Sequence, residues 1–266
     1  MYKAHWNMTV NPFSRNQSQY CYESEDYRNA HSRLKYLTTQ KGFGLFTGLP
    51  GTGKTFTLRA YLNSLNKNLY KVFYTPLSTL TLQDFYRNLA YGLDIDPSHR
   101  KAEVYRQIQD RIVSLSKDKR ITPCIVIDEA QYLNTSILND LKIIFNFDMD
   151  SVQHAVVILA GLPVLNHILG KAIHEAIAQR IIINYAFTGL SRTEMETYIA
   201  NGLSVSGANE NICKPAALEA LYSASGGSIR KLNALICNAL IIGTQNKLDS
   251  IDTDTVMAAQ NELQIV

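Results

Sequence analysis

The chain has 266 residues, of which 46% are apolar and 18% charged, and its formal net charge is +3. This length suffices for one large domain or for a medium domain with a small one attached, and the composition is that of an ordinary soluble globular protein. The mild positive charge permits nucleic-acid binding, but it is not the strongly basic footprint that would argue for it.

The cysteines and the apolar runs exclude several classes of protein. The four cysteines show no paired spacing, which argues against a zinc site or a disulfide framework and for a reducing compartment. The longest apolar runs are 155–165 and 232–243, far short of the ~20 residues that a bilayer-spanning helix needs. Because the N-terminus also has no signal segment, we expect a cytoplasmic protein that does not enter a membrane.

Apolar runs alternate with amphipathic stretches through most of the chain. The sequence predicts strands at 43–47, 70–75, 124–129, 155–160 and 181–185. It predicts helices at 55–65, 84–93, 101–115 and 135–145. Strands that alternate with helices indicate a parallel three-layer α/β sheet, which binds its ligand at the carboxyl ends of the strands.

From about residue 191 the strand pattern stops. Ser191 and Glu194 have the spacing of a capping box, which predicts that a helix begins there. This helix is predicted over 192–205, and three more are predicted at 215–224, 228–243 and 252–263, with no strand between them. The sequence therefore predicts a small all-α domain after the α/β domain.

Residues 48–55 read Gly-Leu-Pro-Gly-Thr-Gly-Lys-Thr, a complete phosphate-binding loop between a predicted strand and a predicted helix. Glycine allows backbone angles and close approaches that let successive N–H groups point at phosphate oxygens. Lys54 would reach the β- and γ-phosphates of ATP, and the Thr55 hydroxyl would ligate Mg²⁺. The phosphates would lie at a helix N-terminus, which favours anions. The residues predicted here to hold ATP are Gly48, Pro50, Gly51, Thr52, Gly53, Lys54, Thr55 and Phe56.

Two carboxylates end the apolar run that begins at residue 124. Asp128 would hold Mg²⁺ through water, and Glu129 would polarise the water that attacks the γ-phosphate. The alternative is that these two residues simply open the next turn. Because a complete phosphate loop precedes them, we favour a catalytic role for Glu129 and Lys54 and a metal-binding role for Asp128 and Thr55.

Taken together, these motifs resemble the AAA+ ATPases. Within them, the chain is similar to the branch that contains the ExeA-type secretion ATPases and the transposition helper ATPases of the TnsC, TniB, MuB and IstB kind. The segments that carry the resemblance are 11–13, 42–55, 125–131, 161–163, 179–181, 189–194 and 226–230. The resemblance implies three parts: an N-terminal segment 1–40 that packs on the ATPase core, an AAA+ nucleotide-binding domain 41–190 and a helical lid domain 191–266.

The resemblance also implies two arginine roles, and the chain departs from the family pattern at Leu162 and at Ile229. Arg180 matches the arginine finger that reaches a neighbouring subunit's γ-phosphate, and Arg230 matches the sensor arginine that contacts nucleotide from the lid. The alternative for each is an ordinary surface arginine. Family members usually carry a polar residue where this chain has Leu162, so hydrolysis is expected to be slow.

Relatives of the TnsC kind assemble with ATP as a ring or helical filament on double-stranded DNA and recruit or stimulate a transposase. By that resemblance, loops after the second strand and its helix would contact DNA without reading sequence. The residues predicted to do so are Thr79, Thr81, Ser98, Arg100 and Lys101. Basic residues from Arg106 to Arg120, including Arg111 and Lys119, would extend this surface, although a plain solvated helix face is the alternative.

The resemblance thus predicts an ATP-dependent, DNA-binding regulator of transposition and DNA recombination that forms homo-oligomers. Two alternatives stay open. One is a secretion or envelope-assembly ATPase that acts on protein partners, and the other is a stand-alone regulatory ATPase switch. The tyrosines do not decide between them, because Tyr70, Tyr74, Tyr86 and Tyr105 lie at apolar-periodic positions that favour packing.

Overall fold

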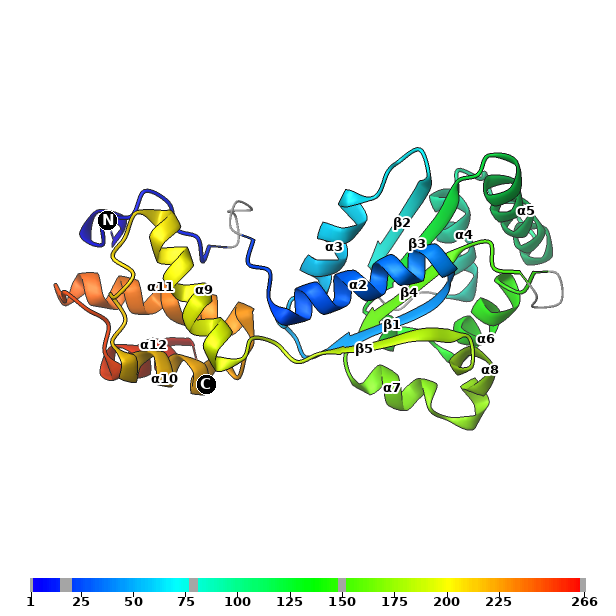
Figure 1. Ribbon diagram of the computed structural model, residues 1–266. Helices are drawn as coiled ribbons and strands as arrows, with labels where there is room; N and C mark the ends of the chain where they lie inside the picture. Colours follow the sequence, from blue (N-terminus) through cyan, green and yellow to red (C-terminus); the bar gives the residue numbers. More distant parts are fainter. Residues whose placement is uncertain (1, 15–20, 77–80, 148–151, 264–266) are drawn as a thin grey trace. The chain divides into compact units, whose positions relative to one another are not determined.

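The computed structural model describes residues 2–14, 21–76, 81–147 and 152–263, and the chain folds as two compact units (Figure 1). The α/β unit comprises Asn29–Gly48 and Lys54–Phe187. The helical unit comprises Met1–Arg28, Leu49–Gly53 and Thr188–Val266. Each unit has its own apolar core.

The α/β unit is built on a five-stranded parallel sheet in the order β2-β3-β4-β1-β5. Its strands are β1 (Gly42–Gly48), β2 (Tyr70–Pro76), β3 (Thr122–Asp128), β4 (Val156–Gly161) and β5 (Ile181–Phe187). Every residue of β1 and β4 is buried, whereas the edge strands β2 and β5 are only partly buried, since only the inner strands have a neighbour on each side. The predicted parallel sheet is confirmed.

Helices cover both faces of this sheet (Figure 1). On one face, α2 (Glu25–Gln40) and α3 (Lys54–Ser64) pack on strand residues such as Val126 and Ile158. On the other face, further helices pack around residues such as Ile125 and Val157, which point the opposite way because strand side chains alternate. These helices are α4 (Leu82–Gly92), α5 (Lys101–Val113), α6 (Thr135–Ile144), α7 (Val164–Leu169) and α8 (Glu175–Ala178).

The predicted elements of the α/β unit are present, with ends that differ from prediction by a few residues. The helix predicted over 101–115 ends at Val113, where a π-helical turn, η1 (Ser114–Asp118), follows. One short 3-10 turn, η2 (Ala130–Tyr132), follows β3. A second, η4 (Ala172–His174), precedes α8. Helix α2 is absent from the predicted elements, although Ala30, Leu34 and Leu37 recur at helical spacing and are fully buried.

The helical unit contains α1 (Tyr2–His5), α9 (Arg192–Ser206), α10 (Pro215–Ser225), α11 (Ile229–Gln245) and α12 (Thr253–Leu263). Its core includes Trp6 and Phe13, and the Trp6 indole donates to the Leu240 carbonyl oxygen at 2.9 Å. The sequence predicts that residues 1–40 pack on the ATPase core. In the structure the apolar side chains of this segment are divided, with Trp6 and Phe13 in the helical core and Leu34 in the α/β core.

Two carboxylates fix the beginning of α2 and the beginning of α9 within the helical unit. Asp26 accepts hydrogen bonds from the backbone N–H groups of Thr188 and Gly189, both at 2.8 Å. Glu194 accepts from the backbone N–H of Glu25 at 2.6 Å and forms the predicted capping box with Ser191. The capping box is therefore confirmed, and its carboxylate also holds a second chain segment.

Candidate nucleotide-binding site

The phosphate-binding loop joins the end of β1 to the beginning of α3. The Lys54 side chain is 8% exposed and donates to the carbonyl oxygen of Gly48 at 2.6 Å. Gly51 and Gly53 have φ angles of +82° and +99°, which residues other than glycine rarely adopt. The first turn of α3 holds no acidic residue, so the positive end of its dipole is not neutralised where phosphates would bind.

The predicted metal ligands lie together at the carboxyl end of the sheet. Asp128, the last residue of β3, is 4% exposed and accepts a hydrogen bond from the Thr55 hydroxyl at 2.9 Å. The same Oδ2 atom accepts from the Tyr74 hydroxyl at 2.7 Å. Burial and this hydrogen bond to a carboxylate raise the pKa of Tyr74 above its ordinary value. The Tyr74 phenol therefore stays protonated and remains a donor to Asp128.

Sequence periodicity did not identify this role of Tyr74. The prediction of a packing role is wrong for Tyr74, whose side chain is 42% exposed, because β2 lies at the edge of the sheet. The prediction is confirmed for Tyr86, which is 3% exposed in the core. The sequence offered only a polar side chain near the carboxyl end of a predicted strand, and the structure shows that this strand lies beside β3.

Glu129 follows Asp128 in a left-handed backbone conformation, with φ 54° and ψ 37°. This conformation is uncommon for a residue with a side chain, and it turns the chain sharply at the end of β3. The Glu129 backbone N–H donates to Asp128 Oδ1 at 2.9 Å, and its exposed carboxylate accepts from the Gln131 amide at 2.6 Å. The predicted catalytic carboxylate is thus held at the same edge as Asp128 and Thr55.

The loop after β4 also contributes to this edge. The backbone N–H of Leu162 donates to the Gln131 side-chain oxygen at 3.0 Å. The Asn166 amide of α7 donates to the Thr47 hydroxyl at 2.9 Å, one residue before the phosphate loop. Sequence analysis did not identify Asn166 or Gln131 as site residues, because each reaches the site through contacts between distant parts of the chain.

Within the helical unit, the loop segment Leu49–Gly53 lies against the beginning of α11. Ser228 caps α11 and donates through its hydroxyl to the Pro50 carbonyl oxygen at 3.2 Å. The Arg230 backbone N–H donates to the Gly51 carbonyl oxygen at 3.4 Å. The backbone of the predicted sensor arginine is thus next to the phosphate loop, and its side chain is exposed.

The remaining residues predicted to contact nucleotide differ in burial. Thr52 is buried, and its hydroxyl donates to the Leu49 carbonyl oxygen at 2.9 Å. Phe56 is 38% exposed on α3, with the Arg59 guanidinium 6.0 Å from its ring centroid. Arg180 is partly buried before β5 and donates to the Lys142 carbonyl oxygen at the end of α6.

The residues predicted to contact DNA are spread over two loops of the α/β unit. Thr79 lies outside the described residues, and Thr81 caps α4 by accepting from the Asp84 backbone N–H at 3.2 Å. Ser98 donates to the Glu103 carboxylate. The Arg100 side chain is 84% exposed, and Lys101 pairs with Asp140 at 2.5 Å. The Arg100 guanidinium also lies 3.9 Å from the Glu103 carboxylate.

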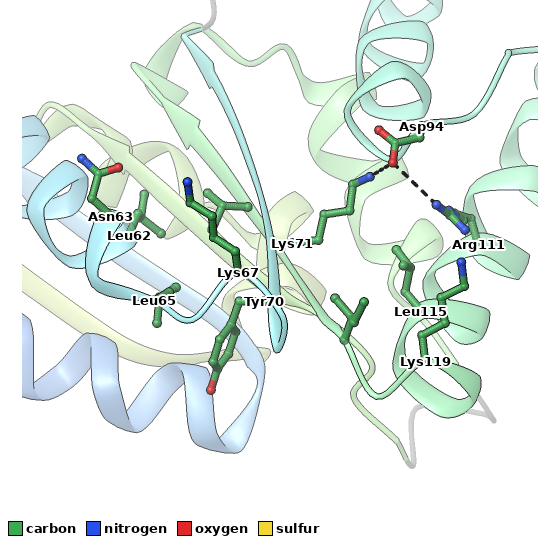
Figure 2. A pocket seen from close by; sticks show the side chains of 12 residues that line it. Leu62, Asn63, Leu65, Lys67, Tyr70, Lys71, Asp94, Arg111, Leu115 and Lys119 are labelled. Atoms are coloured by element: carbon green, nitrogen blue, oxygen red, sulfur yellow. Dashed lines mark hydrogen bonds and ion pairs between the residues drawn. The ribbon is translucent and has the colours of Figure 1, made fainter.

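A basic hollow of about 520 Å³ lies at the opposite end of the sheet, and Figure 2 shows the side chains that line it. It is lined by residues at the beginning of β2 and by part of α5, and the Lys71 and Arg111 side chains both point at Asp94 (Figure 2). Lys119, another of the predicted basic residues, also lines it. Because Asp128 is at the carboxyl end of the strands, this hollow is separate from the predicted nucleotide site.

Two expectations about the chain as a whole meet the structure directly. All four cysteines are free thiols. Among the residues that the structure describes, no helix has the length and apolar character needed to cross a bilayer.

The comparisons with known proteins define the class. The sequence profile of the AAA domain family (AAA_22) matches residues 37–169, half of the chain, and spans both the phosphate loop and Asp128. The chain belongs to this family, and its fold is that of the P-loop AAA+ proteins.

One curated relative is general secretion pathway protein A of Aeromonas hydrophila, which is 31% identical over 247 residues. The match covers 91% of this chain but 44% of that protein, so the chain spans less than half of the relative's length. This similarity agrees with the resemblance to the ExeA-type ATPases.

Solved structures with the same fold are more distant in sequence. Cdc6p from Pyrobaculum aerophilum has a TM-score of 0.71 at 15% identity, covering 97% of this chain and 73% of that chain. Aeropyrum pernix ORC1, solved in complex with DNA, has a TM-score of 0.63 at 16% identity, covering 95% and 68%. The Thermotoga maritima RuvB Holliday junction branch migration motor has a TM-score of 0.59 at 19% identity, covering 91% and 70%. These similarities establish the fold alone.

Proposed function

We propose that this protein hydrolyses ATP and uses ATP to assemble on double-stranded DNA, where it recruits or stimulates a transposase. The observation that carries the ATPase part is the hydrogen bond from Thr55 to Asp128 beside Lys54 and Glu129. The Thr55 hydroxyl, the Asp128 carboxylate, the Lys54 ammonium and the candidate catalytic base Glu129 thus lie at the carboxyl edge of one sheet. This is the set of groups that phosphoryl transfer to water requires.

The residues present fit ATP and Mg²⁺. Gly51 has a positive φ, and a Cβ there would lie 2.4 Å from Ser228 Oγ, so the loop backbone depends on glycine. Thr55 would ligate Mg²⁺ directly and Asp128 would hold it through water. When bound, Mg²⁺ neutralises charge on the phosphate oxygens. Lys54 would bind the phosphates, and Glu129 would orient the attacking water and accept its proton.

The DNA part of the proposal rests on the resemblance to the transposition helpers and on two further points. The loop with Ser98, Arg100 and Lys101 presents an exposed guanidinium, a group suited to phosphate. Proteins of similar fold include ORC1, solved in complex with DNA, and the RuvB Holliday junction branch migration motor. We further propose that Arg180 completes the nucleotide site of a neighbouring subunit in the homo-oligomer. We also propose that the helical unit is a lid domain whose Arg230 contacts the nucleotide.

The test is sedimentation and negative-stain imaging of the protein with duplex DNA, with and without a slowly hydrolysed ATP analogue. We expect rings or helical filaments on DNA only when the analogue is present, and none with Lys54→Ala. Glu129→Gln with ATP should assemble as the analogue does. Nucleotide binding without DNA association at low salt, where phosphate contacts are strongest, would overturn the DNA proposal.

A second candidate function is supported by the 31% identity to general secretion pathway protein A. In that case the ATPase acts on protein partners of a secretion or envelope-assembly apparatus. The same assay separates the two, because ATP-dependent assembly that is indifferent to DNA favours protein partners. A protein that stays monomeric in every condition would instead be a stand-alone switch. Stimulation of strand transfer by a transposase encoded beside it would favour the transposition role.

A further inference from the structure

The Gln131 side chain uses both ends of its amide to join two segments at the candidate catalytic edge. Its Nε2 donates to the Glu129 carboxylate at 2.6 Å, and its Oε1 accepts from the Leu162 backbone N–H at 3.0 Å. A backbone N–H only donates, so the oxygen of the amide must face Leu162. The –NH₂ group must then face Glu129, which fixes the orientation of the amide on chemical grounds.

The Gln131 amide is a side-chain hydrogen-bond partner of the Glu129 carboxylate. Glu129 is exposed, and its backbone is left-handed at the end of β3. An exposed glutamate has several rotamers of similar energy, and a hydrogen bond from a neutral amide selects one of them. The Gln131 amide therefore sets the direction of the Glu129 carboxylate, and because it is neutral it does not pair with the carboxylate as a cation would.

The other end of the amide is fixed by the end of β4. Leu162 follows Gly161, the last residue of β4, and its backbone N–H makes the contact. A Cβ on Gly161 would lie 2.3 Å from Gln131 Oε1 and 3.4 Å from the Gln131 backbone nitrogen. The glycine thus leaves the space that the Gln131 amide occupies, which links the end of β4 to the carboxylate after β3.

We propose that Gln131 is a positioning residue that holds the Glu129 carboxylate for ATP hydrolysis by bracing it against the backbone of Leu162. The proposal rests on the ATPase function proposed above. It implies that the amide controls turnover and leaves ATP affinity unchanged, because it touches Glu129 and not the phosphate loop. It also implies that displacing the amide from Gly161 has the same effect as deleting it.

The test compares kcat, KM, the affinity for a slowly hydrolysed ATP analogue and the melting temperature of four variants. For Gln131→Ala we expect kcat to fall about 10- to 100-fold, the cost of a misplaced catalytic group, with analogue affinity within about twofold of the wild type. Gly161→Ala should reproduce that split. The matched control is Gln109→Ala, which removes an amide that donates to the Ile144 carbonyl oxygen at 3.3 Å, and it should keep the wild-type kcat.

Gln131→Glu supplies a readout that a purely structural role would not move. It keeps the acceptor for Leu162 but replaces the donor to Glu129 with a second carboxylate, which repels the first. We expect kcat to fall at least as far as in Gln131→Ala, with the analogue affinity and the melting temperature close to the wild-type values. A wild-type kcat in both Gln131→Glu and Gln131→Ala would overturn the proposal.

The outcomes also separate this proposal from the proposed function. A wild-type protein that binds the analogue but shows no turnover with or without DNA overturns both. Wild-type turnover with normal kcat in Gln131→Ala overturns the positioning role alone. If kcat, analogue affinity and melting temperature all fall together in Gln131→Ala and Gly161→Ala, the role of Gln131 is structural. That result would also overturn the positioning role.

Discussion

The Lys54 ammonium donates to the carbonyl oxygen of Gly48 at 2.6 Å, across the loop between β1 and α3. Both residues belong to the α/β unit, and Lys54 is buried although it carries a charge. A buried ammonium is costly unless it is hydrogen-bonded, and this carbonyl supplies a partner. The contact holds the ammonium at the last residue of β1.

Replacing Lys54 should therefore remove most of the affinity for ATP. Lys54→Ala deletes a charge-assisted contact worth about 1.5–3 kcal/mol, or about 10- to 150-fold in affinity. Titration with a fluorescent ATP analogue measures the loss directly. Lys67→Ala, which removes an exposed lysine from the hollow at the other end of the sheet, is the control. Equal affinity of both variants would contradict the assignment of Lys54.

Arg180→Ala tests the role of this residue in a neighbouring subunit. Arg180 donates to the Lys142 carbonyl oxygen within its own chain, so the variant also loses an internal contact. We expect the single subunit to bind the ATP analogue normally and the assembled protein to hydrolyse ATP at least about tenfold more slowly. Arg180→Lys should not restore the rate, since a lysine lacks the planar fork. Normal turnover by assembled Arg180→Ala would refute the finger assignment.

Local sequence patterns were sufficient for the parts of the site that lie within one segment. The phosphate loop needs only adjacent residues, and Asp128 is marked by the buried run that it ends. The capping box at Ser191 likewise depends on residues three apart. Each of these signals is local, so each could be read without knowing the strand order.

The parts that the sequence did not reveal depend on contacts across the sheet. Gln131 meets Leu162 only because β3 and β4 are neighbours, and Tyr74 meets Asp128 only because β2 lies beside β3. Periodicity placed Tyr74 among packing residues because it cannot distinguish an edge strand from an inner one. The division of the segment 1–40 between two cores was hidden for the same reason, since Trp6 contacts residues more than 200 positions away.

Gly51→Ala should destabilise the helical unit more than a glycine substitution in open space. The φ angle of Gly51 is +82°, and a Cβ there would lie 2.8 Å from the Arg230 Cβ. Gly226→Ala is a matched control, because Gly226 also has a positive φ, +56°, but nothing lies within 4 Å of the added Cβ. The control should lose about 1 kcal/mol of unfolding free energy from backbone strain alone. Equal losses in thermal or urea unfolding would show that Gly51 is not sterically required.

Glu194 provides a pH-dependent contribution to stability. Burial opposes its ionisation, but hydrogen bonds from the Glu25 and Ser191 backbones outweigh this effect and lower the pKa of Glu194 below its ordinary value of 4.5. A carboxyl whose pKa is lower in the folded state stabilises the protein fully above its unfolded pKa. That stabilisation is lost as the pH falls through the folded pKa.

Glu194→Gln should therefore lower the melting temperature at neutral pH, and the difference from the wild type should close as the pH falls below 4.5. The loss of unfolding free energy at neutral pH should be at most about 1 kcal/mol, since the side-chain amide of the variant still caps α9 through its oxygen. Glu262→Gln, on an exposed position of α12, controls for the loss of a carboxylate and should leave the melting temperature nearly unchanged. A difference for Glu194→Gln that is the same on both sides of pH 4.5 would mean that the ionised carboxylate is not what the donors of Glu25 and Ser191 stabilise.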